Sequence, residues 1–251
     1  MRNLFYCVLF LLLSMSYANA QLNVKDSMVS APLLGLSYAH QFPGGDMVNR
    51  YASNSNVGIN FMFKTKQNWF WSADLNYLFG RTIKDATILD NLKTSNGQII
   101  NINGLYADVR VSERGYFTSA KVGRIFPWLS PNKNCGFVFA VGPGFLQHKI
   151  RYDDIGNTTP QLSKEYRKGY DRLTNGLAVT AFLGYLFLDN RYFINFFAGV
   201  EFIQAWTQNR RGYNFDTMQY DTAKRIDQLT GCKVGIIIPL YKKVPNEFYT
   251  Y

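Results

Sequence analysis

Histidine, serine and cysteine recur in nucleophilic and metal sites, and this chain has few of these residues at spacings that would build one. It has two histidines, His40 and His148, among 251 residues. Acyl transfer or hydrolysis needs a serine beside a histidine that a carboxylate orients. Neither histidine has a serine at a suitable local spacing, because Ser37 has the opposite strand parity to His40. The GxSxG, P-loop, HExxH and CxxC motifs are absent. We therefore predict no catalytic residue, no metal site and no cofactor, and we expect His40 to form hydrogen bonds at a strand end.

Four charged residues lie inside segments that are otherwise apolar on one face: Asp74, Lys121, Glu201 and Lys233. Each falls on the face opposite the large apolar side chains of its segment. Buried charges are tolerated when they are paired and hydrogen-bonded. Asp74 and Lys121 lie at similar predicted heights on neighbouring antiparallel segments, and so do Glu201 and Lys233. The pattern predicts two ion pairs that set register and closure. A narrow gated conduit is the alternative interpretation.

The segments that carry these charges alternate with a period of two residues. In WFWSADLNYLF, residues 69–79, Trp69, Trp71 and Leu75 share one face, whereas Asp74 and Asn76 lie on the other. This alternation recurs in eight segments, residues 33–42, 56–66, 69–79, 115–126, 136–148, 177–187, 192–206 and 229–241. Strands of soluble proteins average about five or six residues, whereas a tilted strand that crosses a bilayer needs about nine to eleven. The length and alternation of these segments are typical of transmembrane barrel strands.

The connections between the segments alternate strictly between long and short. The long ones are residues 43–55, 81–114, 151–175 and 207–228, and the short ones are residues 65–68, 127–134 and 189–191. Outer-membrane barrels have long loops outside the cell and short turns in the periplasm. The sequence therefore predicts an all-β, eight-stranded, antiparallel, up-and-down transmembrane barrel of the OmpA/OmpX type in the cell outer membrane. Both termini are expected in the periplasm, and one short helix is expected in residues 86–94.

The two ends of the chain have compositions of their own. Residues 1–20, MRNLFYCVLFLLLSMSYANA, combine a positive start, an apolar run of about twelve residues and an Ala-Asn-Ala end, which predicts a cleaved signal peptide. The barrel would occupy residues 21–241, followed by a periplasmic tail, residues 242–251. Cys135 and Cys232 would be the two cysteines left after cleavage, and we expect thiols rather than a disulfide scaffold.

The net charge of +10 suggests an anionic partner, such as nucleic acid, lipid head groups or an acidic protein, and the 16% content of aromatic residues is high for a soluble domain. An exported chain is not expected to bind nucleic acid, which leaves outer-membrane lipid, lipopolysaccharide or a protein. Cations and aromatic side chains are mixed at possible partner-binding positions in the last long loop and in the tail: Arg210, Arg211, Tyr213, Phe215, Phe248, Tyr249 and Tyr251. Such mixtures are common at interaction hot spots. Alternatively, the loop charges solvate the loop or bind lipopolysaccharide phosphates, and the tail is a signal for barrel insertion.

Four segments of the chain resemble one protein family: FPGGDMVNRYASNSNVG (42–58), KGYDRLTNG (168–176), QNRRGYNFDTM (208–218) and YKKVPNEFYTY (241–251). The family is the PorG-like outer-membrane barrels of the Bacteroidetes type IX secretion and gliding machinery. The resemblance implies a non-enzymatic protein that anchors a periplasmic ring, made of a lipoprotein and its partner, through the short turns and residues 242–251. Two alternatives stay open: a general OmpA/OmpX-like structural or adhesive barrel, and a lipid-A-modifying enzyme.

Overall fold

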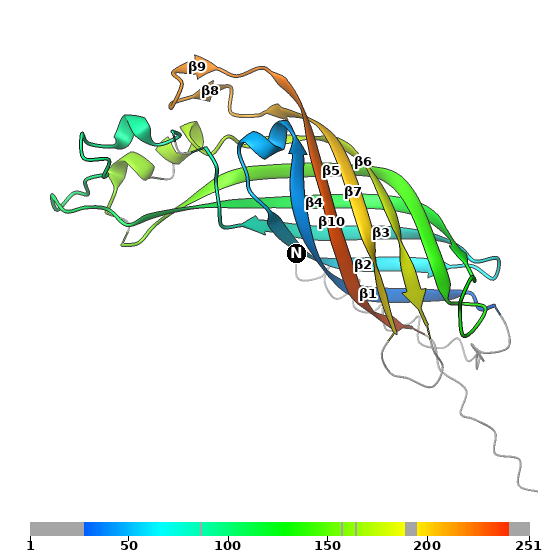
Figure 1. Ribbon diagram of the computed structural model, residues 1–251. Helices are drawn as coiled ribbons and strands as arrows, with labels where there is room; N and C mark the ends of the chain where they lie inside the picture. The colour runs from blue at the N-terminus through cyan, green and yellow to red at the C-terminus, as the bar shows by residue number, and fades with distance from the viewer. Residues whose placement is uncertain (1–27, 86, 157, 164, 189–194, 241–251) are drawn as a thin grey trace, which may run out of the picture.

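The computed structural model describes residues 28–240 except 86, 157, 164 and 189–194, and within them a sheet of eight long strands closes on itself (Figure 1). The long strands are β1 (Ala31–Gly45), β2 (Asn54–Lys64), β3 (Trp69–Gly80), β4 (Val109–Phe126), β5 (Gly136–Asp154), β6 (Thr174–Phe187), β7 (Asn195–Asn209) and β10 (Lys224–Pro239). Each is antiparallel to its neighbour in the chain, and β1 pairs with β10 to close the ring. The predicted fold is confirmed.

Short elements lie in the long connections. They are the 3-10 helices η2 (Asp46–Asn49), η3 (Asp90–Leu92), η4 (Pro160–Leu162) and η5 (Tyr166–Gly169), and the two-residue strands β8 (Tyr213–Asn214) and β9 (Gln219–Tyr220). The helix expected in residues 86–94 is the single turn η3. Among the described residues, no helix is long and apolar enough to cross a membrane.

Strand alternation separates the inside of the barrel from the outside. On β3, Trp69, Trp71 and Leu75 are 46–58% exposed, whereas Asp74 and Leu78 are buried. Other strands present large apolar side chains outward in the same way, among them Leu36, Ile59, Val122, Phe139, Leu183, Val200 and Ile236. Lipid leaves no water for unpaired backbone groups, and a closed barrel pairs them. The apolar outer face and the closed ladder together form a transmembrane barrel.

Apolar clusters fill the barrel on either side of the buried charges. The turn-side cluster, near the short turns, includes Phe70, Ile125, Val138, Phe182, Leu186 and Phe197. The loop-side cluster, near the long connections, includes Leu78, Phe117, Leu146, Ile150, Tyr152 and Ile203. A cavity of about 40 Å³ adjoins Lys121 and Lys233. Side chains therefore fill the lumen, as expected for an eight-stranded barrel.

Several strands extend further on the loop side than the sequence predicts. β4 begins at Val109 rather than at residue 115, and β5 continues to Asp154 rather than ending at residue 148. Val109 pairs with Asp154, so the two strands continue as a ribbon (Figure 1). β10 likewise begins at Lys224 rather than at residue 229. The prediction was wrong for β4 and β5 because the alternation reverses there: Val109, Val111, Ile150 and Tyr152 face inward and polar residues face outward, whereas the prediction looked for large apolar residues on the outer face. At the start of β10 both faces carry polar residues.

Three predictions fall on residues that the structure does not describe. The signal peptide (1–20), the short turn at residues 189–191 and the tail (242–251) lie outside the described residues. The short turn at residues 65–68 is described, and Thr65 N–H donates to the Trp69 carbonyl there at 2.8 Å. Asn68 closes this turn with φ of 63°, a left-handed conformation that asparagine tolerates better than most residues.

Candidate functional site

Four charged side chains meet inside the barrel. Lys121 Nζ on β4 lies 2.7 Å from Asp74 Oδ2 on β3 and 3.0 Å from Glu201 Oε1 on β7. Lys233 Nζ on β10 lies 3.0 Å from the same Glu201 oxygen. The structure thus contains both pairs that the sequence analysis named. It adds the Lys121–Glu201 contact, which crosses the lumen and joins the pairs into one ion chain, Asp74–Lys121–Glu201–Lys233.

The ion pairs are diagonal rather than level. Asp74 lies opposite Ser119 across the β3–β4 ladder, and Lys121 lies opposite Ser72, so the two charges are offset by two residues. The pair on β7 and β10 shows the same offset. The prediction of similar heights was wrong because parity gives the face of a residue but not the stagger between strands. The long lysine side chains span the offset.

Further hydrogen bonds support the ion chain. Asp74 accepts a hydrogen bond from Asn60 Nδ2 and another, at 3.3 Å, from Ser119 Oγ. Lys121 Nζ lies 5.9 Å from the centre of the Phe182 ring, within reach of a cation–π contact. All four charged side chains are at most 6% exposed. Such a network tolerates the loss of one charge poorly, because an unpaired buried charge is then left behind.

The two histidines have partners that differ from a catalytic triad. His148 Nε2 lies 3.0 Å from Asp227 Oδ2, and His148 Nδ1 lies 3.2 Å from the Tyr51 hydroxyl. His40 Nδ1 lies 3.2 Å from Ser55 Oγ, which is the hydrogen-bonding role expected of it. The sequence analysis missed Ser55 because it lies on β2, opposite His40 across the ladder. Within the described residues, His148 contacts a carboxylate but no serine, and His40 contacts a serine but no carboxylate.

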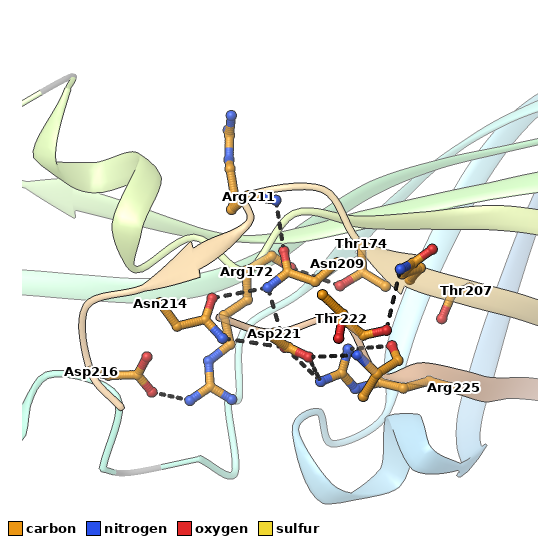
Figure 2. Close-up of polar contacts among 12 residues, drawn as sticks. Arg172, Thr174, Thr207, Asn209, Arg211, Asn214, Asp216, Asp221, Thr222 and Arg225 are labelled. Carbon is orange, nitrogen blue, oxygen red and sulfur yellow. Dashed lines mark hydrogen bonds and ion pairs between the residues drawn. The ribbon is translucent and has the colours of Figure 1, made fainter. Parts of the chain in front are cut away.

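Three long connections fold onto one another to form what we call the long-loop assembly: the described residues of 81–108, 155–173 and 210–223. Arg172 joins all three. Its Nη1 lies 3.2 Å from Asp85 Oδ2, and its Nη2 pairs with Asp216 (Figure 2). Backbone hydrogen bonds add to this, from Ile102 N–H to the Thr158 carbonyl at 2.9 Å and from Phe215 N–H to the Gly169 carbonyl at 2.9 Å. The connections are therefore a folded unit, which the sequence analysis did not predict.

The predicted partner-binding residues of the last long loop are engaged within this assembly. Arg211 makes a two-pronged ion pair with Asp171, with nitrogen–oxygen distances of 2.7 and 2.5 Å. Phe215 packs edge-to-face on Tyr170, with ring centres 5.6 Å apart. Arg210 is exposed and donates to the Asn175 side chain at 2.6 Å. Arg211 and Phe215 thus hold loops together, and a partner-binding role for them stays a prediction.

A second polar cluster fixes the base of the β8–β9 hairpin. Arg225 Nη2 lies 2.6 Å from Asp221 Oδ2, which also accepts from Asn209 and Asn214 at 3.2 Å each (Figure 2). Burial alone would raise the pKa of the Asp221 carboxyl, but the hydrogen bond and charge of Arg225 and the two amide hydrogen bonds bring that pKa below its ordinary value. The carboxylate form of Asp221 therefore stabilises the hairpin.

An open pocket lies where the three connections meet. Its volume is about 640 Å³, and its lining residues are mostly aromatic or apolar: Leu92, Pro160, Gln161, Tyr166, Tyr170, Tyr213, Phe215 and Met218. Tyr166 and Met218 are 60 and 61% exposed, so the apolar surface is open to solvent. Tyrosine offers a flat apolar ring with a polar hydroxyl, which suits binding of peptides or sugars. Of the predicted residues, the pocket brings together Tyr213 and Phe215. Phe248, Tyr249 and Tyr251 lie outside the described residues.

The sequence analysis also missed Arg172 and its two partners, Asp85 and Asp216. They are separated by 44 and 87 residues along the chain. Each lies in a polar loop where charged residues are common. The concentration of charge in KGYDRLTNG and QNRRGYNFDTM was the available signal, but it does not give the pairing.

Comparison with known proteins gives structural neighbours alone. No protein-family model and no curated protein sequence matches the chain. Ail, the attachment invasion locus protein of Yersinia pestis, solved with the heparin analogue sucrose octasulfate, is 11% identical, with 84% of this chain and 100% of that chain covered and a TM-score of 0.40. Neisserial surface protein A is 10% identical, with 82% and 96% covered and a TM-score of 0.42. The outer membrane protein OprG from Pseudomonas aeruginosa is 9% identical, with 86% and 99% covered and a TM-score of 0.44. Identities this low assign no function.

Proposed function

We propose that this protein is a non-enzymatic barrel of the outer membrane that displays the long-loop assembly at the cell exterior as a preformed binding surface. The observation that carries the proposal is that Arg172 ties three connections together beside an open aromatic pocket. A preorganised surface loses less conformational entropy on binding than three independent loops would lose. The filled lumen supports an anchoring role rather than passage of solutes.

Labelling of intact cells tests this orientation. Tyr220 on β9 is 79% exposed and Trp128 in a short turn is 75% exposed, so a cysteine at either position is accessible. We expect a membrane-impermeant maleimide to label Tyr220→Cys on intact cells, and Trp128→Cys only after the outer membrane is permeabilised. Cys232 is replaced by alanine in both variants. The reverse labelling pattern would show that the long connections face the periplasm and would overturn the proposal.

The finer proposal is an anchoring component of a type IX secretion and gliding apparatus, which binds a periplasmic ring lipoprotein and its partner. Its support is the resemblance of four segments, three of which lie in the described residues. Two of these, residues 168–176 and 208–218, contact each other through Arg211–Asp171 and Tyr170–Phe215. The third, residues 42–58, contacts β10 through Asp46, which accepts from Ile226 N–H at 2.8 Å. The three described segments thus lie together on the loop side, so binding of the ring is assigned to the short turns and to residues 242–251.

Affinity purification of the tagged protein from gently solubilised outer membranes tests this finer proposal. Mass spectrometry should recover periplasmic ring lipoproteins in stoichiometric amount, and deletion of residues 242–251 should remove them while the barrel still inserts. Recovery of the barrel alone with lipopolysaccharide would contradict the secretion role and favour a structural or adhesive barrel. The enzymatic alternative predicts a changed lipid A mass spectrum in a deletion strain, and we expect an unchanged spectrum.

A further inference from the structure

A groove lined by cations lies on the outer surface of β3, β4 and β5. Its volume is about 390 Å³, and its floor includes Tyr77 and Tyr116. These tyrosines face outward on adjacent strands, with ring centres 5.3 Å apart. Aromatic girdles of outer-membrane barrels lie at the level of the lipid head groups. The groove is therefore at the height where a lipid head group would contact the barrel.

Two cations of this groove, Arg114 and Lys149, have no acidic partner among the contacts of the described residues. Arg114 and Lys149 lie directly opposite each other on β4 and β5, both facing outward. Like charges directly opposite in a sheet repel each other. Arg114 Nη1 donates to the Glu113 backbone carbonyl at 2.7 Å, which is a neutral acceptor. Among the described residues that line the groove, Asp171 is the single carboxylate, and Arg211 already engages it.

Two further cations border the same groove. Arg167 donates from Nε and Nη2 to the Leu162 carbonyl, at 3.2 and 3.0 Å, so its charge is not neutralised there. Arg151 is paired with Asp153 at 2.8 Å. One concave surface thus carries three cations that have no acidic partner among these contacts: Arg114, Lys149 and Arg167. Such a surface is complementary to phosphate, which arginine can bind with two parallel hydrogen bonds.

An apolar groove continues from the basic one. Its volume is about 480 Å³, and it shares Tyr77 and Tyr116 with the basic groove. Leu36, Ile59 and Leu75 line it and are 53–61% exposed on the membrane-facing surface. The two grooves therefore form a continuous surface that is basic toward the long loops and apolar toward the membrane core. An amphiphile with an anionic head and acyl chains matches both parts, whereas free phosphate would use the basic part alone.

We propose that the two grooves together bind one phosphorylated lipid of the outer leaflet, with its phosphate between Arg114 and Lys149 and an acyl chain along the apolar groove. The proposal rests on the outward orientation given under Proposed function. Phosphate between the two cations relieves their repulsion, so lipid binding stabilises the barrel. The site is absent from the sequence interpretation, which placed lipopolysaccharide contacts in the loops.

Thermal unfolding of the purified protein in detergent tests the site. Diphosphorylated lipid A should raise the Tm of the wild-type protein by about 3 °C or more. Enzymatically dephosphorylated lipid A and inorganic phosphate should each leave Tm nearly unchanged. The double variant Arg114→Gln/Lys149→Gln should lose the lipid-dependent rise while its lipid-free Tm stays at or above that of the wild type, because the cross-strand repulsion is removed. Lys224→Gln, an exposed cation on β10 outside the groove, is the matched control and should keep the rise.

The outcomes separate this site from the wider proposal. An equal rise with inorganic phosphate or with dephosphorylated lipid A, or a full rise in the double variant, overturns the lipid site. Labelling of Tyr220→Cys on intact cells reports orientation independently. A labelled Tyr220→Cys together with a wild-type Tm that lipid A does not shift would refute the lipid site and leave the proposed function standing.

Discussion

The lumen and the long-loop assembly are both held by ion pairs, but their pairs depend on different parts of the structure. In the lumen, Lys121 on β4 and Glu201 on β7 come from strands that face each other across one closed sheet, and both are almost fully buried. In the long-loop assembly, Arg172 joins loops and is 12% exposed, with Asp85 18% exposed. Lumen charges should therefore govern the stability of the whole barrel, whereas loop charges should govern the order of the binding surface.

The largest expected effect is that of Glu201→Gln. This change removes the carboxylate that Lys121 and Lys233 share and leaves one carboxylate, that of Asp74, which pairs with Lys121. We expect a loss of about 3–5 kcal/mol in the free energy of unfolding, because Lys233 is then buried without its ion pair. Urea unfolding in lipid vesicles measures it. The double variant Glu201→Gln/Lys233→Met restores charge balance and should recover much of the loss. If the double variant is as unstable as the sum of the two single changes, the ion chain does not act as a unit.

Arg172→Met should act locally. Loss of the contacts to Asp85 and Asp216 should weaken the long-loop assembly by about 1–3 kcal/mol, because hydrogen bonds to charged groups are lost at partly buried positions. We expect faster proteolysis within residues 81–108 and 210–223 and an unchanged urea midpoint for the barrel. Arg210→Met, which removes an exposed contact, is the control. A shift of the barrel's urea midpoint in Arg172→Met would mean that the barrel and the long-loop assembly unfold as one cooperative unit.

Asp221 makes the hairpin sensitive to acid. Because its pKa in the folded protein is lowered from 3.8, the stabilisation is fully present above about pH 4 and is lost as pH falls through the lowered value. The Asp221 N–H, which donates to the Gly212 carbonyl at 3.0 Å, should exchange faster with solvent at acidic pH, after correction for intrinsic exchange. Asp221→Asn should remove this dependence. The same dependence in the asparagine variant would assign it to another group.

The smallest effect is expected at the surface of η5. Lys168 and Glu165 lie 2.8 Å apart but are 54 and 80% exposed, and ion pairs this exposed contribute little. Lys168→Ala should change neither proteolysis of the assembly nor the urea midpoint. A clear change in either would mean that loop stability depends on surface charge rather than on the buried contacts of Arg172.

Sequence reasoning predicted the lumen better than the loops, and the cause is physical. A strand places every second side chain inward, so parity alone put Asp74 and Lys121 inside the barrel. Parity does not give the stagger, and for that reason the two-residue offset and the Lys121–Glu201 contact were not foreseen. The loops have no such period. Asp85 and Arg172 are 87 residues apart, and their contact depends on how far β4 and β5 extend. The polar outer face after residue 148, with Ile150 and Tyr152 turned inward, concealed that extension.

Hydrogen exchange of the wild-type barrel in lipid vesicles tests most directly the claim that the long connections form one folded surface. The amides of Ile102 and Phe215 donate to backbone carbonyls of a different connection, and Lys84 N–H donates to the Arg50 carbonyl at 2.8 Å. The account predicts that these three amides exchange well below the rate of an unstructured peptide. Exchange at the unstructured rate, with the barrel strands still protected, would contradict it.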